Sequence, residues 1–209
     1  MSGARGLFLT FEGGDGSGKT TQSALLTEWL TGQGRTVVHA REPGGTELGL
    51  ELREIILHRR GYIAPRAEAL LYAADRAHNV ATVVRPALER GDIVIQDRYL
   101  DSSVAYQGAG RVLDGTEVRE LSLWATERLL PDLTILLDLD IETGRTRLDD
   151  SRTRYDRLEA EAAEFHHRVR DAYLTLAEAE PARFLVLDGS APVEQLAERI
   201  RGRVSELLA

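Results

Sequence analysis

The stretch EGGDGSGKTT (residues 12–21) follows a short apolar run and opens a long helical pattern. Residues 13–20 match G-x-x-x-x-G-K-[ST] at every fixed position. A glycine-rich loop between a strand and a helix turns its backbone N–H groups inward, and the helix N-terminus adds its positive end. The stretch therefore predicts a phosphate-binding loop over residues 13–20, at the junction of a strand and a helix.

Lys19 is the one lysine among the 26 lysine and arginine residues of the chain. A guanidinium is a wide planar fork, whereas an ammonium is a compact charge on a thin stem. A backbone nest around phosphates has room for the ammonium, so we expect Lys19 to reach the β- and γ-phosphates and Thr20 to ligate Mg²⁺. The expected ATP contacts are Gly13, Gly14, Asp15, Gly16, Ser17, Gly18, Lys19, Thr20 and Thr21.

Apolar runs of strand length alternate with helical patterns along the whole chain. The runs occupy residues 6–12, 36–40, 92–96, 133–139 and 183–188, and the helical patterns occupy 18–32, 46–59, 66–90, 116–130, 157–180 and 192–208. This alternation predicts one α/β domain over residues 1–209, with helices around a buried, mostly parallel sheet. Pro86 predicts a kink or break near Arg85. The charged stretch 149–157 is expected to form an exposed loop or a fraying helix end.

The composition limits the partners and the location of the protein. The 209 residues carry a net charge of −8 and contain no cysteine. The acidic balance argues against a general nucleic-acid-binding surface, so an anionic substrate needs a local concentration of basic residues. No apolar run reaches the roughly 18 residues needed to span a membrane. The lack of cysteine fits the reducing cytoplasm, where we expect the protein.

A second polar site is predicted at the end of the third apolar run, where Asp97 and Arg98 follow IVIQ. Ligands in open α/β sheets bind at the carboxyl ends of strands. Asp97 could hold Mg²⁺ through water and Arg98 could grip a phosphate with two parallel hydrogen bonds. A surface ion pair would look the same in isolation, but three further segments carry suitable groups: residues 41–46, 72–76 and 102–108.

Six segments together resemble the thymidylate kinase family, in that family's order and approximate spacing. They are FEGGDGSGKTT (11–21), REPGGT (41–46), AADR (73–76), DRYLDSS with AYQG (97–103 and 105–108), PDLTILLD (131–138) and DRLE (156–159). The resemblance implies transfer of the γ-phosphoryl group of ATP to dTMP, with Mg²⁺. It also implies a nucleoside-monophosphate-kinase fold with a five-stranded parallel sheet, a short lid and a homodimer.

The resemblance assigns the phosphate and sugar of the acceptor to a few residues. Arg98 and Arg53 would hold the phosphate of dTMP, and Asp15 would reach its 3′-hydroxyl. Tyr106 would press against C2′, where the extra hydroxyl of a ribose does not fit. Together with Lys19, Asp97 and Arg98 are the residues of this region that we expect to act in catalysis.

The thymine base is assigned in the same way. Tyr72 would stack on the base, although this position is commonly Phe in the family, and its phenol needs a polar partner or water. Arg76 would donate to a thymine carbonyl and Ser103 would bond the base edge. The expected substrate-binding set is completed by Glu42, Pro43 and Gln107. The implied tight turn favours a cis Glu42–Pro43 bond, whereas only about 5–6% of X–Pro bonds in folded proteins are cis.

Some members of the family carry the transition-state arginine inside the phosphate loop, where this chain has Gly16. The resemblance implies that the arginine then comes from a lid, here about residues 145–157. We expect Arg152 to supply it, with Arg147 and Arg154 as alternates. Arg157 is expected to pair with Asp156 or Glu159.

Two alternatives to dTMP phosphorylation remain open from the sequence. One is a kinase for another nucleoside monophosphate, and the other is a nucleotide-gated ATPase that serves as a binding module. A GTPase switch is excluded because its Asn-Lys-x-Asp element needs a second lysine.

Several other polar and aromatic residues receive structural interpretations. Asp138 and Asp140 could form a metal pair but fit better as the polar end of a strand. The five histidines show no metal-ligand spacing, and His166 with His167 is expected on a solvated helix face. Trp29 and Trp124 are expected in the core or at a subunit interface.

Overall fold

The computed structural model describes residues 6–59, 61–151 and 156–209. Five parallel strands form one sheet in the order β2-β3-β1-β4-β5. They are β1 (Phe8–Glu12), β2 (Val37–Arg41), β3 (Ile93–Asp97), β4 (Leu133–Asp138) and β5 (Phe184–Asp188). All five strands fall within or beside the apolar runs, so the predicted α/β fold with a parallel sheet is confirmed.

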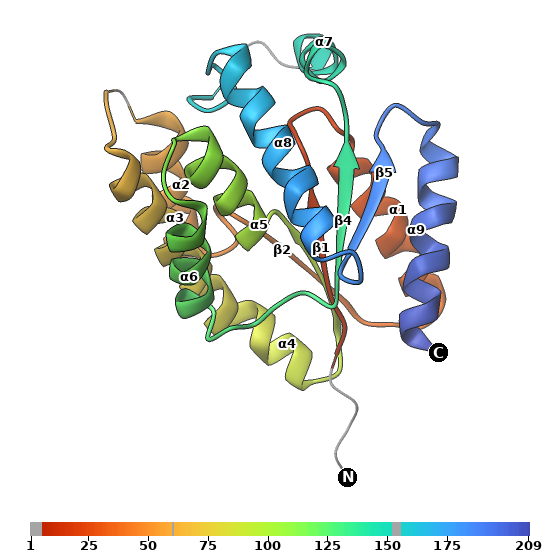
Figure 1. The fold of residues 1–209 in the computed structure, drawn as a ribbon. Coiled ribbons are helices and arrows are strands. Elements are labelled where there is room, and N and C mark those ends of the chain that lie inside the picture. The colour runs from red at the N-terminus through yellow and green to blue at the C-terminus, as the bar shows by residue number, and fades with distance from the viewer. Residues whose placement is uncertain (1–5, 60, 152–155) are drawn as a thin grey trace.

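Helices cover both faces of the sheet (Figure 1). The α-helices are α1 (Lys19–Gly32), α2 (Glu47–Arg53), α3 (Pro65–Asn79), α4 (Arg85–Glu89), α5 (Leu100–Ser103), α6 (Gly115–Ala125), α7 (Ile141–Ser151), α8 (Ala163–Ala179) and α9 (Val193–Leu208). Three π-helical segments join them, η1 (Glu54–His58), η2 (Val80–Val84) and η3 (Val104–Gly110). In the part of the chain that the structure describes, no helix is long and apolar enough to cross a membrane.

Strand residues alternate between two cores. On one face, Leu9 and Phe11 of β1 pack with Leu26 of α1 and Ile200 of α9. On the other face, Phe8 of β1 joins residues of η2 and α4, while α8, η1 and η3 share a separate apolar cluster. Because both faces of the sheet are covered, most strand residues are apolar, and the parallel strands end along one edge of the sheet.

One helical break occurs where it is predicted, and two helical boundaries differ from the predicted pattern. The α-helix α3 gives way to the π-helical η2, and α4 begins at Arg85 with Pro86 in its first turn, which confirms the predicted break near Arg85. The pattern over 116–130 ends at Ala125 because Glu127 and Arg128 take left-handed backbone angles. The pattern over 157–180 becomes α-helical at Ala163.

Candidate active site

The phosphate loop joins β1 to α1, as the motif predicts. Gly18 caps α1 without a side-chain hydrogen bond, which leaves the first backbone N–H groups of the helix for a ligand. Lys19 Nζ donates to the carbonyl oxygens of Gly13 (3.1 Å) and Gly14 (2.7 Å). Burial, followed by the nearby Arg98 charge, lowers the pKa of Lys19 to about 8. An anion bound in this loop would restore the favourable environment that the ammonium lacks.

Helix α7 packs directly on the phosphate loop. A Cβ at Gly16 would lie 2.4 Å from the carbonyl oxygen of Gly144. Arg147, one turn further along α7, donates from Nη1 to the carbonyls of Gly16 (3.4 Å) and Gly189 (3.1 Å). Arg147 therefore connects the phosphate loop to the turn after β5. Its contact with Gly16 joins residues that are 131 positions apart in the sequence.

A cavity of about 580 Å³ opens beside the loop, and both Thr20 and Asp97 line it. Asp97 ends β3, and its Oδ1 is buried without a hydrogen-bond partner in the described residues. A buried carboxylate oxygen costs free energy unless something binds it. Carboxylate and hydroxyl oxygens are the donors that Mg²⁺ prefers, so these two residues fit the metal expected with ATP.

Arg98 holds the centre of the site in a strained backbone conformation, with φ of 63°. Its Nη2 lies 2.5 Å from Asp15 Oδ1, and its Nη1 donates to the Gly13 carbonyl at 3.1 Å. The guanidinium also lies over the Tyr106 ring, 5.0 Å from its centroid. Burial alone would raise the pKa of Asp15, but the charges of Arg98 and Lys19 outweigh it and lower that pKa.

The residues expected to meet the acceptor face the same cavity. Tyr72, Ser103 and Tyr106 line it together with Arg53. The Tyr106 hydroxyl lies 3.4 Å from Asp15 Oδ2, so these two residues of the site contact each other. Burial raises the pKa of Tyr72 and of Tyr106 above the usual 10, so both side chains stay neutral.

Two residues expected to bind substrate have their polar groups engaged elsewhere. Gln107 is buried and donates from Nε2 to Glu68 Oε1 at 3.0 Å. Arg53 donates from Nη1 to the Pro43 carbonyl at 2.9 Å and so supports the turn after β2. The Glu42–Pro43 bond in that turn is cis, which confirms the prediction.

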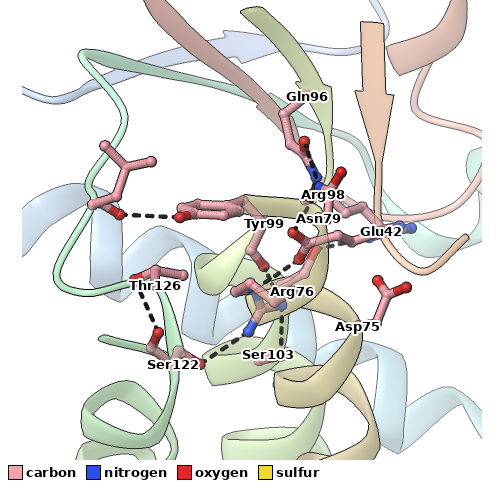
Figure 2. Close-up of polar contacts among 12 residues, drawn as sticks. Glu42, Asp75, Arg76, Asn79, Gln96, Arg98, Tyr99, Ser103, Ser122 and Thr126 are labelled. Carbon is pink, nitrogen blue, oxygen red and sulfur yellow. Dashed lines mark hydrogen bonds and ion pairs between the residues drawn. The ribbon is translucent and has the colours of Figure 1, made fainter. Parts of the chain in front are cut away.

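Arg76 lies in a dense buried network (Figure 2). Its Nε donates to Glu42 Oε2 at 2.7 Å, and its Nη1 donates to Ser122 Oγ at 3.0 Å. Its Nη2 donates to the Tyr99 carbonyl and to Ser103 Oγ. Four of the five guanidinium N–H groups thus have protein partners, which fixes the orientation of the remaining one. Burial raises the pKa of Glu42 to about 7 despite the arginine beside it.

Comparisons with known proteins show the family of the chain. Residues 11–200 match the family model described as thymidylate kinase. The chain belongs to the thymidylate kinase family. Proteins named thymidylate kinase from Leifsonia xyli and Clavibacter sepedonicus are 76% and 70% identical over 95% and 98% of this chain, and 94% and 97% of their own lengths. One from Deinococcus radiodurans is 50% identical over 97% of this chain and 98% of its own length.

The region that the family resemblance assigns to the lid is partly helical here. Residues 145–151 belong to α7, so of the two expectations for the stretch 149–157, a helix end and not an exposed loop describes residues 149–151. Arg152 and Arg154 lie outside the described residues. Arg157 donates to Glu68 and to the Ile56 carbonyl, so its expected pairing with Asp156 or Glu159 is wrong. Asp156 instead accepts from the backbone of residues 158 and 159.

The strand-end interpretation of Asp138 and Asp140 is supported. Arg170 binds both carboxylate oxygens of Asp138, at 2.6 and 2.8 Å. Asp140 caps α7 through the backbone N–H of Thr143 at 2.8 Å. Among the described residues, no group of three or more His, Cys, Asp or Glu could hold a metal ion.

The two tryptophans differ in burial, and so do the two adjacent histidines. Trp29 packs against the core, whereas Trp124 is 80% exposed on α6. His167 is exposed as expected, but His166 lines a small second cavity of about 60 Å³ behind the phosphate loop. The sequence interpretation also missed Glu12, whose position as the polar last residue of an apolar strand was the available signal.

Proposed function

We propose that this chain transfers the γ-phosphoryl group of ATP to dTMP and forms dTDP. The observation that carries the proposal is a cavity that is lined both by the phosphate loop and by Tyr72, Arg98 and Tyr106. Such a cavity can hold a nucleotide phosphate and an acceptor phosphate together, which turns a bimolecular transfer into a positioned one. Family membership supports the choice of dTMP.

The residues of the chain divide the work of phosphoryl transfer, which rests on positioning and charge stabilisation. Lys19 would leave the loop carbonyls and move to the phosphates of ATP, because these carry more negative charge than carbonyl oxygens. Arg98 would hold the acceptor phosphate, and Asp15 would keep the guanidinium aimed at it. Asp97 and Thr20 would hold Mg²⁺, which when bound neutralises charge on the phosphate oxygens.

Base and sugar selection would rest on rigid groups. Tyr72 offers a neutral aromatic face from α3, and the remaining N–H of Arg76 would donate to a thymine carbonyl. Tyr106 would fill the space beside C2′. Since α5 and η3 are buried and its ring packs edge-on against Phe165 and Tyr173, Tyr106 has little freedom to move aside for a ribose.

The acceptor test separates this proposal from its rivals. ADP release from ATP and Mg²⁺ is measured with dTMP, its ribose analogue, dUMP, dCMP, dGMP and dAMP in turn, and with no acceptor. We expect turnover with dTMP above all and little without an acceptor. Preference for a different monophosphate would indicate another nucleoside-monophosphate kinase, and equal hydrolysis without an acceptor would indicate an ATPase binding module.

The lid arginine stays part of this proposal. Arg152 is the first candidate for the transition-state arginine, and Arg147 on α7 already contacts the phosphate loop. A transition-state arginine contributes on the order of 10³-fold or more to kcat in related phosphoryl transfers. If Arg147, Arg152 and Arg154 can each be changed to Ala with less than about a tenfold loss of kcat, the lid does not supply the arginine.

We also propose a homodimer. Large apolar side chains are exposed on elements that contact one another: Leu48 on α2, Ile55 on η1, Leu70 on α3 and Trp124 on α6. A continuous exposed apolar surface often marks an interface between subunits. Light scattering with size-exclusion chromatography should give about twice the 23.1 kDa chain mass, and Trp124→Glu should shift it toward the monomer. A monomeric wild type would contradict the proposal.

A further inference from the structure

Glu12 is the last residue of β1 and directly precedes the phosphate loop, yet no role in binding either substrate falls to it. Its carboxylate is completely buried. Burying a carboxylate costs several kcal/mol in the absence of partners, so a buried one needs a well-defined set of donors. The donors around Glu12 reveal what it does.

Three donors converge on this carboxylate from two segments distant in sequence. The backbone N–H of Tyr99 donates to Oε1 at 2.7 Å. The hydroxyls of Ser102 and Tyr173 donate to Oε2, at 2.6 and 2.9 Å. No arginine or lysine contact with Glu12 is found in the described residues, and burial followed by the charge of Asp101 raises the pKa of Glu12 to about 7.

Two of these three donors also contact Arg98, and the third belongs to the next residue in the chain. Arg98 Nη1 donates to Ser102 Oγ and to Tyr173 Oη, both at 3.4 Å. The Ser102 and Tyr173 hydroxyls also lie 2.8 Å from each other. When each gives its one proton to Glu12, its lone pairs remain free to accept from the arginine. The third donor is the backbone N–H that follows Arg98, and holding it stabilises the left-handed backbone of that residue.

We propose that Glu12 is a positioning residue for Arg98, acting through two hydroxyls and one backbone N–H to aim the guanidinium at the acceptor phosphate. The inference rests on the proposed function, because it assigns that phosphate to Arg98. Asp15 holds the guanidinium from the ligand side, while Glu12 orients its supports from the core side. Glu12 itself touches neither substrate.

Glu12→Gln is the decisive substitution because it keeps the shape of the side chain and removes one acceptor. An amide offers one oxygen and one NH₂, so it cannot accept on both sides. The new NH₂ group then faces either the N–H of Tyr99 or the two hydroxyls, all of which are donors. Hydroxyl protons that leave Glu12 turn toward the other hydroxyl, 2.8 Å away, or toward Arg98. Either change takes acceptor lone pairs away from the guanidinium, which would then shift.

The readout is a split between the two substrates in steady-state kinetics. A displacement of about 1 Å can cost on the order of 10²-fold, so we expect KM for dTMP to rise and kcat/KM for dTMP to fall by roughly ten- to a hundredfold. The KM for ATP should stay unchanged. Equal effects on both substrates, or an unchanged KM for dTMP, would overturn the proposal. A wild type that does not phosphorylate dTMP would instead refute the proposed function.

Two further variants keep the test sharp. Asp132→Asn is the matched control, because its Oδ2 accepts from the Phe8 N–H at 2.7 Å at the opposite end of the same strand; it should lower stability without changing either KM. Tyr173→Phe combined with Glu12→Gln should lose less than the sum of the single losses, since both act through one network. Additive losses would contradict the proposal. If Glu12→Gln does not fold, Glu12→Asp, which retains the charge but withdraws the oxygens, should give the same substrate split.

Discussion

Three glycines of the phosphate loop allow backbone strain to be separated from steric exclusion in one short segment. A Cβ at Gly14 would meet no atom within 4 Å, and its backbone is not left-handed. A Cβ at Gly18 would also meet nothing, but φ is +96°. At Gly16, φ is +76° and the Cβ would lie 2.4 Å from the Gly144 carbonyl oxygen. Alanine therefore introduces no strain and no clash at Gly14, backbone strain alone at Gly18, and both strain and a clash at Gly16.

The expected losses of stability follow from these geometries. Gly14→Ala should be neutral or stabilise by up to about 1 kcal/mol, because alanine restricts the unfolded chain. Gly18→Ala should cost about 1–2 kcal/mol for the left-handed backbone. Gly16→Ala adds about 1–3 kcal/mol of overpacking, for a total of roughly 2–5 kcal/mol. In a domain of this size that lowers Tm by roughly 4–20 °C.

The assay is thermal unfolding of the nucleotide-free protein, followed by calorimetry for the wild type and the three alanine variants. We expect Tm to fall in the order Gly14→Ala, Gly18→Ala, Gly16→Ala. Equal Tm values for the last two would show that α7 yields at no cost, and a large loss for Gly14→Ala would refute the reasoning altogether. The same contact excludes an arginine side chain at position 16 while α7 keeps its place, which favours an arginine from outside the loop.

The remaining predictions concern residues lining the cavity. Burial lowers the pKa of Lys19 from its usual 10.5 to about 8. The unfolded chain therefore holds the proton more tightly, and the unfolding free energy of the nucleotide-free protein should rise between about pH 8 and 10. Lys19→Met should remove this rise in urea titrations and abolish phosphoryl transfer; a rise that persists would assign it to another group. Arg76→Ala should raise KM for dTMP and, by leaving buried Glu42 unpaired, cost about 3–5 kcal/mol of stability; normal stability in urea unfolding would show that the ion pair contributes little. Tyr106→Ala should bring kcat/KM for the ribose analogue closer to that for dTMP, and an unchanged ratio would move sugar selection elsewhere.

The phosphate loop and the sheet could be predicted from the sequence because their signals are local. The loop depends on glycines, one lysine and one threonine at fixed spacing, and its strand–loop–helix setting follows from adjacent residues. Strands of a parallel sheet that is covered on both faces are rich in apolar residues, so all five could be located. Asp97 and Arg98 at the end of β3 were predicted as site residues for the same reason, since parallel strands bring their carboxyl ends to one edge.

Only the tertiary structure decided which side chains support these residues. The order β2-β3-β1-β4-β5 places β1 between β3 and β4, and the chain returns through α8 so that Tyr173 meets Glu12 across 161 positions. Arg157 likewise reaches Glu68 across 89 positions in place of the acidic neighbours expected from the sequence. Buried polar groups must find partners wherever the fold brings donors and acceptors together. Those pairings depend on the packing of whole elements, because sequence spacing carries no information about groups that meet only after the sheet has assembled.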